Sequence, residues 1–363
     1  MNIVITAPSL DPSQNVSGVS TVVSSIITYN KKHHYFHFLL GRADHQINKF
    51  SWLIRLLRQL SWFPFFVKRN RIELVHQNLP FDAKGLIREY IVNFWCRLLG
   101  LPVVLHIHGG EFFTCITKNF IYRCIATALF RYSKKVLVLS ESERLTLHHK
   151  YGFSSAITLV NSIDTSLYSQ ECLAQNFAKP TLLFMGRITE NKGVNEIVEA
   201  FSLLKKEIDF KFILCGTGSL TNYFRMRCAE LLGDDFEFKG VVSGSTKIRI
   251  IQNSHLLILP SYFEGLPMVL LESMAAGVVP IVTNVGSISR VVKHNFNGLF
   301  VEKKNPESIY RQVKSIVSDY CRFKMLSDSA VGTVASEYDI KRYIEHLNHI
   351  YMASISHDTS VDS

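Results

Sequence analysis

The stretch that decides the fold runs from His255 to Thr283 and reads "HLLILPSYFEGLPMVLLESMAAGVVPIVT". It opens with a short apolar run, passes through a loop into a helix-forming run from about Pro267, stops at Gly277 and continues as a second apolar run. Short apolar runs bounded by Gly and Pro are typical of buried parallel strands, and a glycine often ends the helix between them. This stretch therefore predicts a βαβ unit.

The same alternation continues on both sides of this unit. Apolar runs of strand length occur at 2–7, 37–41, 72–78, 102–109, 134–140, 181–187, 211–216, 255–260 and 278–283. Longer amphipathic stretches separate them, which indicates an α/β fold with doubly wound sheets. Because so many strands are hard to hold in one open sheet, we expect two Rossmann-like domains.

The polar stretch from Val160 to Pro180 marks the expected domain boundary, because it has little periodicity and ends in proline before a new strand. The last helix-forming run carries Ile340, Tyr343 and Leu347 on one stripe, as expected of a helix that packs on a domain. We place an N-terminal domain at 1–163, a C-terminal domain at 164–337, a last helix at about 338–353 and a disordered tail at 354–363.

The composition of the chain limits which ligands and which cellular compartment are expected. The 40 Lys and Arg residues outnumber the 30 Asp and Glu residues, and the formal charge of +10 favours anionic ligands. The cations do not form one platform interleaved with aromatic residues, so we expect no nucleic-acid partner. Seven scattered cysteines without metal-site spacing, and an opening "MNIVITAPSL" that reads as a strand, favour the cytosol over export.

The segment 49–71, "KFSWLIRLLRQLSWFPFFVKRNR", allows two interpretations. Its leucines form a helical stripe that is flanked by Trp and Phe side chains and by Lys and Arg, a mixture that suits an anionic membrane interface. It also fits a core-facing helix of the first domain that is followed by a solvated basic loop. No apolar run in the chain reaches the ~18 residues of a spanning helix, so we expect at most peripheral attachment.

Three loops at predicted strand ends carry the candidate chemistry. Gly186 ends a strand, and Arg187 and Lys192 lie in the turn before a helix that starts near Val194, an arrangement that suits a diphosphate. Gly216 and Gly218 allow the backbone of the next loop to approach a ligand closely.

The third loop is the one quoted first. Glu264 lies in it, and Glu272 follows on the second turn of the helix. A loop carboxylate at a sheet edge can accept hydrogen bonds from sugar hydroxyls, and a helix carboxylate among apolar neighbours needs a partner such as a ribose.

In this order and spacing, "FMGRITENKGV", "CGTGSL" and "PSYFEGLPMVLLESMAAG" resemble the retaining glycosyltransferases of GT-B fold known as glycosyltransferase group 1, or family 4. The resemblance is strong from Thr181 to about Val301. It implies two Rossmann-like domains that face a central cleft, with the last helix packed back on the first domain. It also implies that Arg187 and Lys192 hold the donor diphosphate, Glu264 the donor sugar and Glu272 the nucleotide ribose.

The resemblance extends to further residues of the site. His108 in "LHIHGGEF" is expected near the transferred sugar, whereas we expect His106 to point to the other face of its strand as a buried, satisfied histidine. Gly18 stands in the loop after the first strand, where the family usually has a glycine pair. The remaining donor-binding residues implied are Gly186, Gly216, Gly218, Gly265, Leu266 and Ser287.

The implied activity is retaining transfer of a sugar from a nucleotide-diphosphate donor to a glycan or lipid-linked acceptor, as in bacterial surface polysaccharide assembly. The expected catalytic residues are His108, Glu264, Arg187 and Lys192. They are expected to act mainly by stabilising the charges that develop in the transition state. The sequence has no evident D-x-D loop, so we expect no metal and no other cofactor. Two alternatives stay open: a nucleotide-sugar epimerase of the same architecture, and a non-catalytic partner subunit that binds nucleotide sugar.

Overall fold

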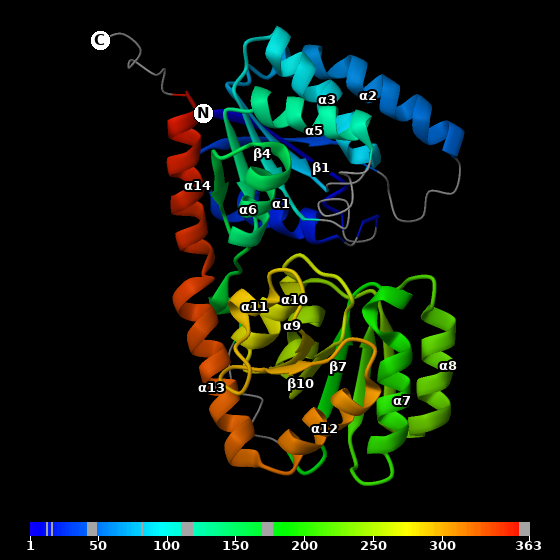
Figure 1. The fold of residues 1–363 in the computed structure, drawn as a ribbon. Helices are drawn as coiled ribbons and strands as arrows, with labels where there is room; N and C mark the ends of the chain where they lie inside the picture. Colours follow the sequence, from blue (N-terminus) through cyan, green and yellow to red (C-terminus); the bar gives the residue numbers. More distant parts are fainter. Residues whose placement is uncertain are drawn as a thin grey trace. The chain divides into compact units, whose positions relative to one another are not determined.

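The computed structural model describes residues 1–11, 14–15, 17–41, 49–80, 83–109, 119–168 and 177–355. Its internal contacts divide the chain into two compact units, drawn in Figure 1. Unit 1 comprises Met1–Asn161 together with Ile340–Ser363, and unit 2 comprises Ser162–Asp339. The first boundary falls after Asn161, where the sequence suggested residue 163.

Unit 1 is built on a parallel sheet of six strands in the order β2-β1-β3-β4-β5-β6. Its central strands are buried along their whole length, which fits their apolar sequences and the helices on both faces. The strands are β1 (Asn2–Ala7), β2 (His34–Leu39), β3 (Leu74–Leu79), β4 (Val103–Ile107), β5 (Lys135–Val138) and β6 (Ala156–Thr158).

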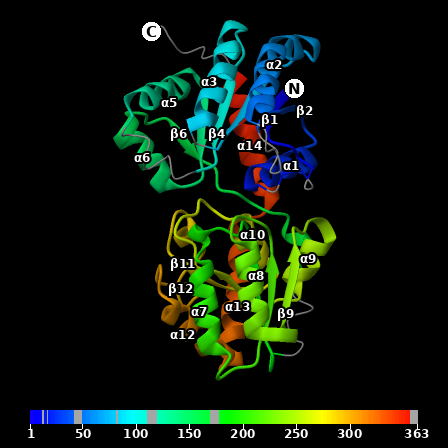
Figure 2. The same cartoon turned by 90° about the vertical axis from the view of Figure 1, so that its right-hand side faces the viewer.

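The helices of unit 1 cover both faces of this sheet (Figure 2). Asn30 donates to the Asn348 side chain at 2.8 Å, and the Tyr351 hydroxyl lies 2.6 Å from His76 Nδ1, so α14 is held against α1 and β3. The helices are α1 (Gly18–Tyr29), α2 (Lys49–Arg69), α3 (Ala83–Leu98), α5 (Phe120–Tyr132), α6 (Glu141–Tyr151) and α14 (Ile340–Ile355). The expected tail at 354–363 starts with the end of α14, and residues 356–363 lie outside the described residues.

Unit 2 repeats the architecture with a parallel sheet in the order β12-β11-β10-β7-β8-β9. Its strands are β7 (Thr181–Met185), β8 (Lys211–Cys215), β9 (Phe236–Gly240), β10 (Leu256–Leu259), β11 (Val279–Thr283) and β12 (Leu299–Val301). Its helices are α7 (Val194–Leu204), α8 (Thr221–Leu232), α9 (Gly244–Gln252), α10 (Met268–Ala275), α11 (Ile288–Val291), α12 (Pro306–Val317) and α13 (Tyr320–Glu337). Two parallel six-stranded sheets with helices confirm the expected α/β fold class.

Residues 49–69 of the segment 49–71 form the helix α2, which has Pro64 inside it and Lys68 and Arg69 in its last turn rather than in a loop. One face enters the core of unit 1 through Phe63 and Val67. The opposite face exposes Ile54, Leu57, Trp62 and Phe65 to between 48% and 56% of their surface. Among the described residues, no helix is long and apolar enough to cross a membrane.

Candidate active site

Four loops of unit 2 meet at the carboxyl ends of its strands, where open α/β sheets bind ligands. The loops after β7 and β8 are joined by hydrogen bonds from Gly186 N to Cys215 O, at 3.1 Å, and from Ile188 N to Thr217 O, at 3.0 Å. A Cβ atom on Gly216 would lie 1.8 Å from Gly186 O, and one on Gly218 would lie 2.2 Å from Ile188 O. Both glycines therefore let one loop pack on the other.

Lys192 and Glu264 are brought together from different loops. Lys192 ends a single 3-10 turn before α7, and its ammonium group forms an ion pair with Glu264 Oε1. The Ser261 hydroxyl donates to the same oxygen at 2.7 Å. The two charged side chains are only 18% and 10% exposed. Within the described part of the chain both bonds fall on Oε1, which leaves Oε2 of Glu264 available to a ligand.

The loop after β11 packs on the Glu264 loop. A Cβ atom on Gly286 would lie 1.9 Å from Glu264 O, and the φ of 54° at Gly286 also favours glycine. Ser287 N donates to Gly265 O at 2.9 Å, and the Ser287 side chain is buried. The Ser287 N–H therefore already has a partner inside the protein, although the resemblance implied that Ser287 binds the donor. Leu266 is buried beside them.

Glu272 is buried on α10, with 5% of its surface exposed. Its two carboxylate oxygens lie 2.7 and 2.6 Å from Nζ of Lys247, which comes from α9. The sequence analysis missed Lys247. The sequence pattern around Glu272 indicated only that some partner exists, because a carboxylate on an otherwise apolar helix face requires a cation or several donors.

Arg187 lies in the same turn as Lys192 and is exposed. With the residues that the structure describes, Arg187 forms no ion pair or hydrogen bond. The backbone bond from Tyr262 N to Asn191 O, at 2.8 Å, ties this turn to the Glu264 loop. Unit 2 therefore gathers Arg187, Lys192 and Glu264 on adjoining loops of one sheet edge, with Arg187 unengaged among the described residues. Glu272 follows on α10 with a cation of its own, Lys247.

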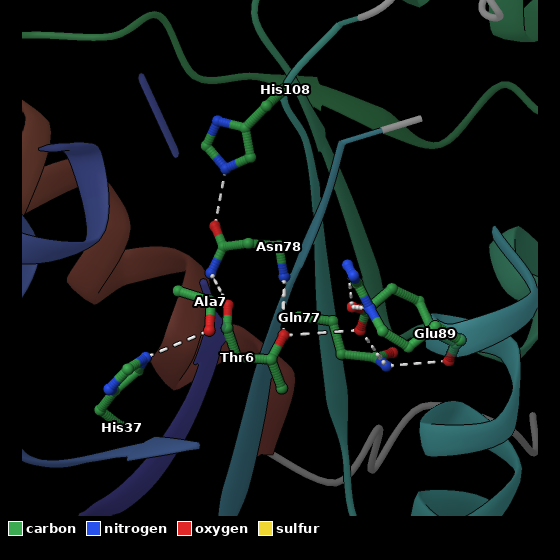
Figure 3. A network of polar contacts seen from close by, with 8 residues as sticks. Thr6, Ala7, His37, Gln77, Asn78, Glu89 and His108 are labelled. Atoms are coloured by element: carbon green, nitrogen blue, oxygen red, sulfur yellow. Dashed lines mark hydrogen bonds and ion pairs between the residues drawn. The ribbon is translucent and has the colours of Figure 1, made fainter. Parts of the chain in front are cut away.

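The other predicted site residues belong to unit 1. His108 follows the end of β4, and its N–H donates to Leu79 O at 3.0 Å. Its Nε2 lies 2.7 Å from Asn78 Oδ1 (Figure 3). Burial lowers the pKa of His108 from 6.5 to about 3, so the ring is neutral at physiological pH. Gly18 starts α1, and a Cβ atom there would meet nothing within 4 Å, so packing does not require glycine.

His106 is buried as expected, but its expected direction and hydrogen bonding were wrong. Its ring centroid lies 4.1 Å from that of His108, because residues two apart on a strand share a face. Neither ring nitrogen of His106 has a hydrogen-bond partner among the described residues. Within the same residues, no group of three or more His, Cys, Asp or Glu side chains is placed to hold a metal ion.

Comparison with known proteins decides the family. Residues 172–331 match the model of the glycosyl transferases group 1. Over these residues the chain is a group 1 glycosyltransferase domain. This confirms the expected family and, with it, a transferase enzyme.

Two relatives illustrate the range of this family. An uncharacterized glycosyltransferase of Methanocaldococcus jannaschii is 29% identical over 171 residues, which cover 47% of this chain and 44% of that protein. The Escherichia coli UDP-Gal:alpha-D-GlcNAc-diphosphoundecaprenol alpha-1,3-galactosyltransferase is 19% identical over 83% of this chain and 80% of its own length.

Solved structures confirm the GT-B fold of this glycosyltransferase. The sucrose-phosphate synthase of Thermosynechococcus elongatus matches with a TM-score of 0.79 and 16% identity, over 97% of this chain and 98% of that one. Anabaena HepE in complex with UDP-glucose matches with a TM-score of 0.76 and 14% identity, over 97% of this chain and all of that one.

Proposed function

We propose that this glycosyltransferase moves a sugar from a nucleotide-diphosphate donor to a glycan or lipid-linked acceptor, with retention of anomeric configuration, in bacterial surface polysaccharide assembly. The observation that carries the proposal is the contact between Lys192 and Glu264 beside Arg187 at one sheet edge. A nucleotide sugar offers an anionic diphosphate and a neutral, hydroxyl-rich ring next to each other. A cation and a carboxylate in contact suit these two ends.

We propose that the bound donor replaces the contact between Lys192 and Glu264 with contacts of its own to both side chains. The diphosphate of the donor binds Arg187 and Lys192, and the sugar hydroxyls donate to the carboxylate of Glu264. Glu272 is proposed to accept the ribose hydroxyls while Lys247 holds it in place. The UDP-glucose bound to the structurally similar HepE supports a donor of this class.

The proposed chemistry is stabilisation of the leaving group. Breakage of the bond between the anomeric carbon and the diphosphate leaves negative charge on the outer phosphate, and Arg187 and Lys192 would balance it. One preorganised donor in such a site is worth about 3–4 kcal/mol. We propose that these two cations supply the positive charge without a metal cofactor. Retention would follow if the acceptor hydroxyl attacks from the face of the leaving group and the departing phosphate takes its proton.

The acceptor is proposed to be membrane-linked. The rings of Trp62 and Phe65 lie 4.4 Å apart between centroids, tilted by 44°, on the exposed face of α2, and Arg58 is exposed on the same helix. Indole and phenyl rings beside basic side chains bind the interface of an anionic bilayer. A relative that acts on a diphosphoundecaprenol-linked sugar supports this choice. The protein would then work on the cytoplasmic face of a membrane.

The test is transfer by the purified protein, with a panel of UDP- and GDP-sugars and with lipid-linked and free glycan acceptors. We expect nucleoside diphosphate release that depends on an acceptor, and its loss in Lys192→Ala and Glu264→Ala. Lys314→Ala is the matched control, because its ion pair with Glu207 lies on the surface of unit 2.

Two results would contradict the proposal. Sugar isomerisation without any acceptor would indicate an epimerase. Full transfer by either site variant would remove Lys192 or Glu264 from the mechanism.

A further inference from the structure

Asn78 connects His108 to the first strand of unit 1. It is the last but one residue of β3 and is 2% exposed. Its Nδ2 lies 2.9 Å from Thr6 O, and its Oδ1 lies 2.7 Å from His108 Nε2 (Figure 3). A backbone carbonyl can only accept a hydrogen bond, so the amide group that faces Thr6 O must be the NH2. The atom that faces His108 is therefore the carbonyl oxygen.

This orientation determines where the hydrogen of His108 lies. Because Asn78 Oδ1 can only accept, His108 Nε2 must be the donor. Burial keeps the ring neutral by lowering the His108 pKa to about 3, and a neutral imidazole carries a single hydrogen. The Nδ1 atom then carries a lone pair and no hydrogen. Among the described residues, nothing occupies it.

Thr6, whose carbonyl oxygen accepts from Asn78, is itself held by further hydrogen bonds. The Thr6 hydroxyl accepts from Asn78 N at 3.1 Å and donates to Glu89 Oε2 at 3.5 Å. Glu89 is fully buried on α3 and also accepts from Gln77 Nε2 at 3.1 Å and from Arg88 Nε at 3.0 Å. All of these contacts lie inside unit 1, so the position of Asn78 is fixed by the core rather than by solvent.

We propose that Asn78 is a positioning residue that locks His108 in the neutral tautomer with hydrogen on Nε2. His108 then presents Nδ1 as a hydrogen-bond acceptor for a hydroxyl of the bound carbohydrate. The choice of carbohydrate rests on the proposed function, but the tautomer does not. An acceptor of this kind binds a sugar hydroxyl and rejects a ligand that offers only lone pairs.

The tautomer is measured by NMR on the full-length protein labelled with 15N-histidine, using two-bond 1H–15N correlations. The His108 signals are assigned by their loss in His108→Gln. We expect one neutral form at neutral pH, with Nε2 protonated, Nδ1 unprotonated and slow exchange of the Nε2 hydrogen. A spectrum in which Nδ1 carries the hydrogen, or in which the ring is charged, would overturn the proposal without any variant at Asn78.

Asn78→Leu removes the acceptor, and Asn93→Leu is the matched control. Asn93 is an equally buried amide of the same network, with Nδ2 3.1 Å from Gln77 Oε1, and it does not touch His108. We expect Asn78→Leu to speed exchange of the Nε2 hydrogen and to populate the second tautomer, whereas Asn93→Leu leaves the His108 signals unchanged. Unchanged His108 signals in a folded Asn78→Leu protein would contradict the proposal.

Kinetics separate this inference from the proposed function. With an active donor, Asn78→Leu should lower kcat/KM by about tenfold or more, the loss expected for one well-placed hydrogen bond. If no transfer is found with any donor, the tautomer measurement still decides the role of Asn78. If transfer is found but the Nδ1–H form is present, only the role of Asn78 fails.

Discussion

The ammonium group of Lys247 lies within 2.7 Å of both carboxylate oxygens of Glu272, and the two side chains come from successive helices, α9 and α10. Glu272 is surrounded by buried residues of α10, so its charge depends on this one cation. We predict that Lys247→Met destabilises unit 2 by about 2–3 kcal/mol, below the full loss for a completely buried pair, because Lys247 is partly exposed. Urea denaturation with a probe in unit 2 measures the change.

The double variant Lys247→Met/Glu272→Gln provides the control. Removal of both charges should restore most of the lost stability, since no unpaired carboxylate remains. A Lys247→Met protein as stable as wild type would show that Glu272 does not need this partner.

A second prediction compares two glycines. Gly216→Ala places a Cβ 1.8 Å from Gly186 O at a backbone φ of 129°, so the two loops must separate. We expect a loss of at least about 2 kcal/mol in unfolding free energy. Gly18→Ala starts a helix in open space and should be neutral or slightly stabilising. Equal stability of the two variants in thermal unfolding would contradict the loop packing described above.

The exposed face of α2 gives a third prediction. Trp62→Glu with Phe65→Glu should reduce binding to vesicles that contain anionic lipid by tenfold or more, because two interfacial rings are lost and two like charges are added. Met226→Glu is the control, since Met226 is 58% exposed in unit 2. Co-sedimentation at several salt concentrations measures binding. Vesicle binding that survives the double change would place any membrane contact elsewhere.

The buried histidines of unit 1 predict an acid sensitivity. Burial lowers the pKa of His76 and of His108 from 6.5 to about 3, and it lowers that of His106 well below 6.5. The unfolded chain binds more protons than the folded one between these values, so stability is complete above about pH 6.5 and falls as the pH drops toward 3.

Urea midpoints at pH 7 and pH 5 test this, with a probe in unit 1. His76→Gln should flatten the dependence, provided that it folds. His148→Gln is the control, because His148 is exposed on α6. Identical slopes for wild type and His76→Gln would remove His76 as a source of the effect.

The central strands were predictable from the sequence, but three of the four edge strands were not. All nine apolar runs became strands, because burial on both faces demands continuous apolar residues. The strands missed are β6, β9 and β12, and each lies at the edge of a sheet. Two of them have only three residues, and β9 alternates between partly buried and exposed positions, so neither length nor hydrophobicity sets them apart.

The site shows the same division between what is local and what depends on tertiary contacts. The order of Arg187, Lys192, Glu264 and Glu272 was readable because each follows a strand that the sequence reveals. The pairing of Glu272 with Lys247 was not, because α9 carries no pattern that points at α10. The direction of His106 follows from strand alternation alone and was misassigned, which hid the contact between the His106 and His108 rings.

The most direct test of the central claim is calorimetric titration of Lys192→Ala and Glu264→Ala with two ligands. These are the nucleotide sugar that the wild-type protein binds best and the nucleoside diphosphate derived from it. If Lys192 holds the diphosphate and Glu264 the sugar, Lys192→Ala weakens both ligands. Glu264→Ala then weakens only the nucleotide sugar and leaves the nucleoside diphosphate unchanged or bound more tightly. Equal losses for both ligands in Glu264→Ala, or no loss in Lys192→Ala, would contradict the account.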